Sequence, residues 1–339
     1  MRQAVMTAPG KIEYREVEVP LPDKHEVLIR IRNIGVCGSD IHVYHGMHPY
    51  TSYPVVQGHE VSGEVEAVGS GVTGFAAGDK VTFVPQLVCG TCYPCRHGMH
   101  HVCDSLKVMG FQAPGAGQEF FAVPQDLTIK LPADMSLVHG AMIEPMAVAV
   151  HALGRAGEIK NRRVLVLGAG PIGNLVAQCA RGLGAAAVMI TDLSDVRLAK
   201  ARDCGIAYTV NTSREELASA VSRHFGPDKA DVILECVGVE DAIAGGIAAA
   251  RKGSVLIVVG VFGTKPTVDL GLVQDRELTL HGSLMYQHQD YRKAIELVAE
   301  GKVTLDELIT DTFAFDRYQE AYRHIEESAD RTLKVMIEL

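Results

Sequence analysis

One stretch in the second half of the chain constrains its fold more than any other: RVLVLGAGPIGNLVAQCARGLGAAAVMITD, residues 163–192. An apolar run leads into G-x-G-x-x-G at Gly168, Gly170 and Gly173, and a second apolar run ends at Asp192. In a strand–turn–helix unit the first glycine permits the tight turn, the second lets a pyrophosphate approach the backbone, and the third lets helix pack on strand. The stretch therefore predicts a βαβ unit that binds a dinucleotide at a helix N-terminus.

The acidic residue at the end of this unit bears on the choice of dinucleotide. Asp192 lies nineteen residues after Gly173, where a carboxylate accepts hydrogen bonds from the adenosine ribose and repels a 2′-phosphate. We therefore expect NAD rather than NADP, with Pro171 and Ile172 completing the phosphate loop. Arg197 weakens the argument for NAD over NADP, because its side chain could pair with a 2′-phosphate or stack on adenine. The alternative is that Asp192 only caps the helix that begins near Ser194.

The pattern of apolar residues divides the chain into parts. Residues 1–150 consist of short alternating strands separated by Gly and Pro, whereas strand–helix alternation begins near residue 160. Further continuous apolar runs, ADVILECVG and SVLIVVG, are typical of a parallel sheet covered by helices on both faces. At 339 residues the chain is long for one core. We predict an α/β protein of two domains.

Composition excludes several classes of partner. The formal net charge is −9, so no basic face is expected for nucleic acid or an anionic membrane. No apolar run approaches the ~20 residues of a membrane span, and the N-terminus lacks the apolar core of a signal peptide. We expect a cytoplasmic protein whose partner is a small molecule.

Four of the eight cysteines lie in CGTCYPCRHGMHHVC, residues 89–103. The spacing is C-x2-C-x2-C-x7-C, from Cys89, Cys92, Cys95 and Cys103. Disulfides are rare in a reducing compartment, and bacterial iron–sulfur runs use a shorter third gap followed by Cys-Pro. Four thiolates suit a closed structural zinc site. We interpret the segment as a zinc lobe rather than an iron–sulfur site or four free thiols.

A second set of candidate metal ligands is scattered. GVCGSDIH contains Cys37, GHEVSGEVEAVG contains His59 and Glu60, and GAMIEPMAVAVHALG contains Glu144. A buried carboxylate is costly unless paired, and no Lys or Arg lies near Glu144 in sequence. Thiolate, imidazole and carboxylate with a water form an open, catalytic zinc site. Adjacent side chains diverge in a regular strand, so we expect Glu60 and Glu144 to share the carboxylate role. The alternative is that these residues fill the core.

Taken together, the motifs resemble the zinc-dependent medium-chain alcohol dehydrogenase superfamily over essentially the whole chain. The likeness is carried by GVCGSD at 35–40, G-H-E-x-x-G-x5-G-x2-V at 58–72, GDKV at 78–81, the zinc lobe, Glu144-Pro145 and GAGPIG at 168–173. It implies a GroES-like catalytic domain over 1–150, a Rossmann domain over 151–285 and a return to the catalytic domain over 286–339. It also implies two zincs per chain, the catalytic one in the cleft between the domains, and a homodimer or homotetramer.

The resemblance also implies a reaction. Zinc has no redox chemistry, so hydride must pass to the nicotinamide, and a metal lowers the pKa of a coordinated hydroxyl. We expect oxidation of a secondary alcohol, with Ser39 and His42 relaying the proton. The alternative roles of these two residues are a turn serine and a surface histidine.

The substrate is less constrained than the reaction. Glu60 and Glu144 resemble the sorbitol, threonine and butanediol dehydrogenase branch, but Leu284-Met285-Tyr286 stands where polyol enzymes of that branch have Phe-Arg-Tyr. Without that arginine, polyols, diols, sugar acids and amino-alcohols all remain candidates.

Two other functions are compatible with parts of the sequence. A zinc-free quinone or enoyl reductase should lack Cys37, His59 and the zinc lobe. A non-enzymatic zinc-binding interaction protein would have no use for a dinucleotide fingerprint beside an open metal site. Metal content separates the readings, since the enzyme requires two zincs per chain and the interaction protein one.

Overall fold

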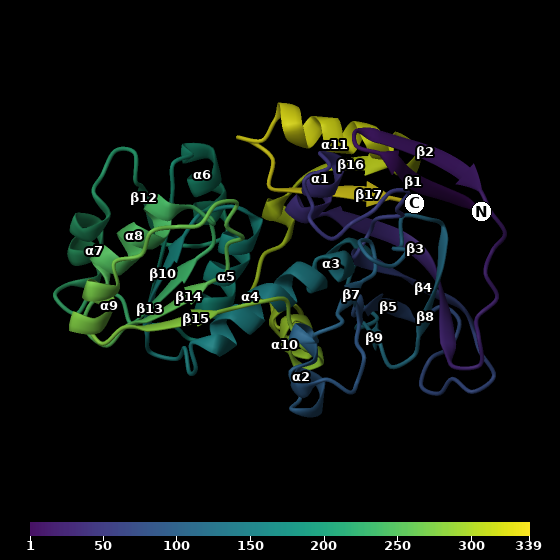
Figure 1. Cartoon of the computed structure of the whole chain (residues 1–339), viewed down its shortest axis with the longest axis horizontal. Helices are drawn as coiled ribbons and strands as arrows, with labels where there is room; N and C mark the ends of the chain where they lie inside the picture. Colours follow the sequence, from purple (N-terminus) through teal and green to yellow (C-terminus); the bar gives the residue numbers. More distant parts are fainter. The chain divides into compact units, whose positions relative to one another are not determined.

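A computed structural model describes all residues, 1–339 (Figure 1). The chain forms two compact units. The first combines Met1–Glu144 with Ile309–Leu339, and the second is Pro145–Leu308. Each unit has its own sheet and its own core.

The first unit is built on a seven-stranded sheet. Its strands run in the order β16 (Ile309–Ala314), β17 (Lys334–Glu338), β3 (Glu26–Val36), β4 (Glu60–Val68), β5 (Lys80–Phe83) and β9 (Thr128–Lys130), and β8 (Phe120–Pro124) also pairs with β3. The β3 strand alternates buried residues Val27, Ile29 and Ile31 toward the core, as the period of two in a strand requires.

Smaller elements complete this unit. They are β1 (Arg2–Ala8), β2 (Lys11–Glu16), α1 (Gly38–Tyr44), β6 (Gln86–Leu87), α2 (Tyr93–Arg96), β7 (Lys107–Val108), α3 (Leu137–Ala141) and α11 (Tyr318–Glu327). The α11 helix buries Tyr318, Ala321 and Tyr322. This i, i+3, i+4 spacing forms one apolar face, and Tyr318 and Tyr322 join the main hydrophobic core of the unit.

The end of β3 requires glycine at one position. Gly35 pairs with Glu60 of β4, and Val36 pairs with Val335 of β17 on the other edge of the strand. A Cβ atom on Gly35 would lie 2.1 Å from Oε2 of Glu60, so any larger residue would displace that carboxylate. The missing side chain makes room for Glu60 beneath the strand.

The second unit contains a six-stranded parallel sheet. The order is β12 (Tyr208–Asn211), β11 (Ala187–Asp192), β10 (Arg163–Leu167), β13 (Val232–Glu235), β14 (Val255–Val258) and β15 (Thr279–Gly282). The order reverses beside β10, as in a Rossmann fold. The predicted pairing of a β-rich domain with a Rossmann domain is confirmed.

The helices of the second unit are α5 (Pro171–Gly182), α6 (Asp195–Asp203), α7 (Leu217–Phe225), α8 (Glu240–Ala249), α9 (Leu270–Asp275) and α10 (His288–Ala299), and α4 (Ile143–Arg155) begins at the boundary with the first unit. Helices α5, α6 and α8 pack against strands of the sheet. None of the helices is both long enough and apolar enough to cross a lipid bilayer.

The units differ in extent from the predicted domains 1–150, 151–285 and 286–339. The first boundary falls at Glu144/Pro145, and the return to the first unit begins at Ile309 rather than 286. Residues 286–308 belong to the second unit, and their side chains and backbone make hydrogen bonds within it. Asp290 of α10 lies 2.8 Å from Nδ1 of His151 in α4, and the Thr304 N–H donates to Gln178 of α5 at 2.7 Å.

Candidate functional site

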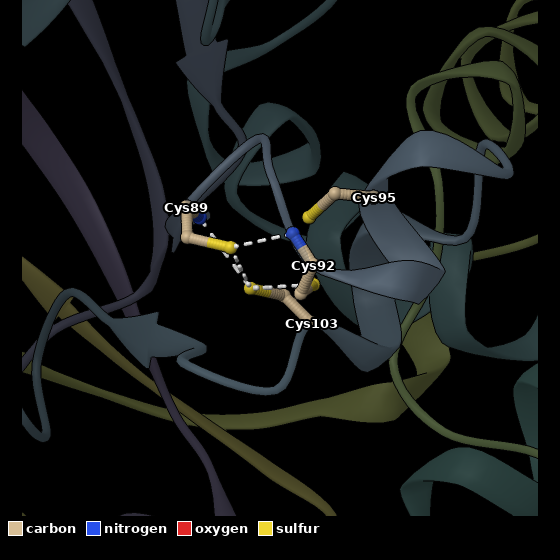
Figure 2. Close-up of side chains that lie close together, drawn as sticks. All are labelled: Cys89, Cys92, Cys95 and Cys103. Carbon is tan, nitrogen blue, oxygen red and sulfur yellow. Dashed lines mark hydrogen bonds between the residues drawn. The ribbon is translucent and has the colours of Figure 1, made fainter.

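The four clustered cysteines converge in the first unit, in the loop that carries α2 (Figure 2). Their sulfur atoms all lie within 4.8 Å of one another, and Sγ of Cys103 lies 3.6 Å from that of Cys89 and 3.8 Å from that of Cys92. A tetrahedron with metal–sulfur bonds of about 2.3 Å has edges of about 3.8 Å. All four cysteines are free. The donor set fits a structural zinc.

The backbone around the lobe is arranged to receive thiolates. The N–H of Cys92 donates to Sγ of Cys89 at 3.3 Å, and the N–H groups of Cys89 and Ser105 each donate to Sγ of Cys103 at 3.4 Å. Hydrogen bonds from the backbone of Thr91 and Cys92 lower the pKa of Cys89 to about 6, whereas burial raises the pKa of Cys95 to about 12. A bound cation would offset the cost of ionising the buried Cys95 thiol.

A second donor cluster forms at the adjoining ends of β3 and β4. Cys37 follows β3, His59 directly precedes β4, and Glu60 is its first residue. Their ligand atoms lie within 4.8 Å of one another, and His59 and Glu60 are 5% and 1% exposed. His59 lies outside the strand, which begins at Glu60, and the loop before it contains Gly58 with a φ of +100°. The divergence expected for a regular strand does not occur.

The other residues of the predicted catalytic set are not among these gathered ligands. Glu144, in the first turn of α4, is buried but is not among the residues whose ligand atoms gather. Ser39 is half-buried on α1, and His42 is exposed in the last turn of the same helix.

Lys334, at the start of β17, faces Glu60 and was missed from sequence. Its Nζ donates to Oε1 and Oε2 of Glu60 at 2.7 and 2.6 Å and to the carbonyl of Val36 at 3.2 Å. Burial alone would lower the pKa of this 3% exposed lysine, but the charges of Glu60, Cys37 and Glu144 outweigh it and raise the pKa. The available signal was a lone lysine in the apolar run TLKVMIEL.

Asp40 connects two of the candidate ligands and had been given no role. Its Oδ2 accepts the N–H of Cys37 at 2.9 Å, and its Oδ1 lies 3.5 Å from Nδ1 of His59. Burial alone would lower the pKa of His59, but the nearby charge of Asp40, with a smaller contribution from Cys37, raises it well above its usual value. A carboxylate behind a ligating histidine fixes the ring and its tautomer. The signal was the spacing of Cys37 and Asp40, which suits a helix N-cap and its third residue.

In the second unit the glycine-rich loop has the geometry of a phosphate cradle. Gly168 has a φ of +96°, and a Cβ on Gly173 would lie 1.8 Å from the carbonyl oxygen of Gly168. A Cβ on Gly170 would meet no protein atom within 4 Å. Gly170 is the N-cap of α5 and provides no side-chain cap. The first turn of α5, beginning at Pro171 and Ile172, is thus left open to an anion.

Asp192 is fixed at the end of β11 beside this loop. Its Oδ2 accepts the N–H of Ala169 and its Oδ1 the N–H of Ser194, both at 2.8 Å. The N-cap of α6 is Ser194, whose hydroxyl accepts the N–H of Arg197. The alternative role of Asp192 as the cap is therefore not observed. Arg197 lies 4.0 Å from Asp192, close enough to affect phosphate recognition.

Each of the two units contains a region that matches a known protein family. Residues 23–133 match the alcohol dehydrogenase GroES-like domain, and residues 171–300 match the zinc-binding dehydrogenase family. The chain is 38% identical over 290 residues to 2-dehydro-3-deoxy-L-galactonate 5-dehydrogenase of Pseudoalteromonas atlantica, covering 85% of this chain and 84% of the relative. The chain belongs to the zinc-dependent medium-chain alcohol dehydrogenases.

Further relatives place the enzyme in the sorbitol dehydrogenase-like branch. It is 36% identical to a sorbitol dehydrogenase of Halalkalibacterium halodurans, covering 97% of this dehydrogenase and 96% of the relative. The crystal structure of galactitol-1-phosphate dehydrogenase from Escherichia coli matches with a TM-score of 0.94 at 32% identity, covering 100% of both chains. The predicted family, GroES-like and Rossmann folds and enzyme class are confirmed. The zinc-free reductase and the interaction protein are not favoured.

The zinc lobe gives the first prediction. Cys95→Ala should remove one zinc and lower the melting temperature by roughly 5–10 °C, because a structural zinc contributes folding free energy. Metal analysis and a thermal melt measure both effects. The matched control is Cys204→Ala, which changes a buried cysteine of the second unit and should keep the metal. Unchanged melting of Cys95→Ala would contradict a structural role.

The ion pair of Lys334 gives the second prediction. Lys334→Met should destabilise the dehydrogenase by about 3–5 kcal/mol, because removing one partner leaves a buried, unpaired carboxylate. The same change at Lys293, whose pair with Glu296 is solvent-exposed, should cost no more than about 1 kcal/mol. Denaturant unfolding compares the two. Equal losses would show that the pair of Lys334 is no more important than a surface contact.

Proposed function

We propose that the dehydrogenase oxidises a secondary alcohol of a polyhydroxylated, open-chain substrate, with zinc held by Cys37, His59 and Glu60 and with NAD as the hydride acceptor. The products are the ketone, NADH and a proton. The single observation that carries the proposal is the cluster of thiol, imidazole and carboxylate within 4.8 Å. Three protein ligands of this kind leave a fourth position for substrate.

The charges around the cluster support a divalent cation. A metal-bound thiolate at Cys37 and carboxylate at Glu60 would supply two negative charges, and a metal-bound imidazole at His59 would supply none. Lys334 pairs with both oxygens of Glu60, and the charge of Glu144, the second buried carboxylate, also acts on it. We infer that Glu60 is the resident carboxylate and that Glu144 is the alternative one. Without a metal cation, the ammonium of Lys334 would face three potential anions in a largely buried site.

Each residue then has a role in the reaction. Zinc supplies a Lewis acid that lowers the pKa of an alcohol, and nicotinamide accepts the hydride. Ser39 and His42 lie three residues apart on α1 and so share a side of that helix. We infer that Ser39 accepts the hydroxyl proton while it passes its own proton on through the cofactor ribose to His42, which is exposed and releases a proton to solvent.

The substrate class rests on the relatives. The relatives are named for a sugar acid, sorbitol and a sugar alcohol phosphate. In Leu284-Met285-Tyr286, Tyr286 is fully buried against Tyr291, and Met285 stands where the polyol enzymes of the branch have an arginine. Without that cation the segment favours neither polyols nor sugar acids, since an arginine would bind the hydroxyls of the one and the carboxylate of the other. An NADH-formation assay over aldonic acids, polyols, simple diols and threonine identifies the substrate class.

We further propose that the enzyme works in the cytoplasm as a homodimer or homotetramer. Eight free cysteines suit a reducing compartment, and the family resemblance supports the assembly.

The catalytic cluster gives a direct test. Cys37→Ala should leave one zinc per chain and reduce turnover by more than about 100-fold, since even the outer partners of metal ligands affect activity by about 10–100-fold. Metal content and NADH formation are measured on the same preparation, with Cys204→Ala as the control. Two zincs and normal turnover in Cys37→Ala would refute the assignment.

The cofactor preference gives another test. Asp192→Asn should lower the ratio of kcat/KM with NAD to that with NADP, because it removes the charge that repels a 2′-phosphate. Affinity for both cofactors should also fall, since an amide oxygen cannot replace both of the acceptors used by Ala169 and Ser194. The ratio isolates the charge effect. An unaltered ratio would assign the preference to other residues.

A further inference from the structure

A buried chain of polar side chains runs from α11 to His59. The hydroxyl of Tyr322 donates to Oε1 of Gln57 at 3.0 Å, Nε2 of Gln57 donates to Oδ1 of Asp40 at 3.0 Å, and Asp40 faces His59 at 3.5 Å. Tyr322, Gln57 and Asp40 are 0%, 3% and 1% exposed. We propose that Tyr322 and Gln57 are positioning residues, which orient Asp40 and through it the metal ligand His59.

The direction of each hydrogen bond in this series follows from which groups can donate and which can only accept. An ionised carboxylate such as Asp40 can only accept, whereas the amide of Gln57 has one end that donates and one that accepts. Gln57 must therefore turn Nε2 toward Asp40, which leaves Oε1 facing Tyr322. A tyrosine hydroxyl can donate to that oxygen and hold the amide in this orientation. If the amide flipped, its carbonyl oxygen would face the carboxylate.

Burial keeps this orientation strict. Burial, followed by the nearby charge of Asp40, raises the pKa of Tyr322 well above its usual value, so its hydroxyl keeps its proton. Tyr322, Gln57 and Asp40 are all too buried for a water molecule to replace a missing hydrogen-bond donor. Unpaired polar groups in such a setting are costly. Removing one donor should therefore reorient the side chain that accepted its hydrogen bond, and with it the next side chain in the series.

Asp40 connects these hydrogen bonds to the candidate metal ligands. Its other oxygen, Oδ2, accepts the N–H of Cys37 at 2.9 Å. One carboxylate therefore accepts a hydrogen bond from the backbone of one candidate ligand and lies 3.5 Å from the ring of another. If Gln57 no longer fixed Asp40, both Cys37 and His59 would lose their common support. Support of this kind sets metal affinity as well as activity.

The packing of Tyr322 can be separated from its hydrogen bond. Its ring lies against Tyr44 at 5.2 Å and Tyr318 at 5.6 Å between centroids. Tyr322→Phe keeps these ring contacts and removes only the hydroxyl. Tyr44→Phe removes a hydroxyl from another buried tyrosine of the same core, and Tyr44 makes no hydrogen bond to Gln57 in this structure. The two variants form a matched pair.

The experiment follows release of zinc to a chelator from the fully metallated enzyme. The inference rests on the proposed zinc at Cys37, His59 and Glu60, so zinc content of the wild type is measured first. One zinc should be released from Tyr322→Phe and from Gln57→Leu roughly 10-fold faster than from the wild type. The zinc of the lobe should be released at the wild-type rate in both. Tyr44→Phe should match the wild type throughout.

The double variant tests whether the two residues act in series. If Tyr322 acts only through Gln57, Gln57→Leu with Tyr322→Phe should release zinc no faster than Gln57→Leu alone. Additive effects would overturn the inference, as would wild-type release from Tyr322→Phe. Should Tyr322→Phe fail to fold, Gln57→Leu with unchanged release would overturn it. A wild-type enzyme that binds one zinc would instead refute the proposed function.

Discussion

The catalytic unit depends on how negative charge is concentrated and balanced at the end of β3. Glu60 and Glu144 are both buried, and Cys37 lies beside Glu60. Such a group of acids would not remain ionised in a protein interior unless cations were supplied. Lys334 supplies one fixed charge, and the pairing of β17 with β3 carries it there. The C-terminal strand is therefore an electrostatic part of the site as well as an edge of the sheet.

The two candidate zinc sites differ in how far apart their ligands and supporting residues lie in the sequence. The lobe takes all its ligands from residues 89–103, and its own backbone N–H groups contact the sulfur atoms. The second cluster draws on β3, β4 and the loop that precedes α1, and Lys334 and Tyr322 support it from more than 260 positions away. A lobe of this kind can form locally, whereas the second cluster exists only once the sheet and α11 are in place.

This contrast explains what could be predicted from sequence. The Rossmann unit and the lobe are contiguous, so the spacings of Gly168, Gly173 and the cysteines identified them directly. Lys334 was missed because the expectation of no nearby cation considered only neighbours in sequence. The boundary at 286 was misplaced because α10 looks the same in sequence whichever unit it joins. Its contacts through Asp290 decide the matter, and they are tertiary.

The start of β4 shows how a local detail bears on a chemical expectation. The expectation that Glu60 and Glu144 would share one role came from treating His59 and Glu60 as neighbours in a regular strand. His59 lies outside β4, which begins at Glu60, and the ligand atoms of both residues lie within 4.8 Å of each other and of Cys37. Glu60 can therefore join the thiol and the imidazole, while the charge of Glu144 acts on Lys334. Lys334 pairs with both oxygens of Glu60, so the position of one lysine bears on which carboxylate is available to a metal.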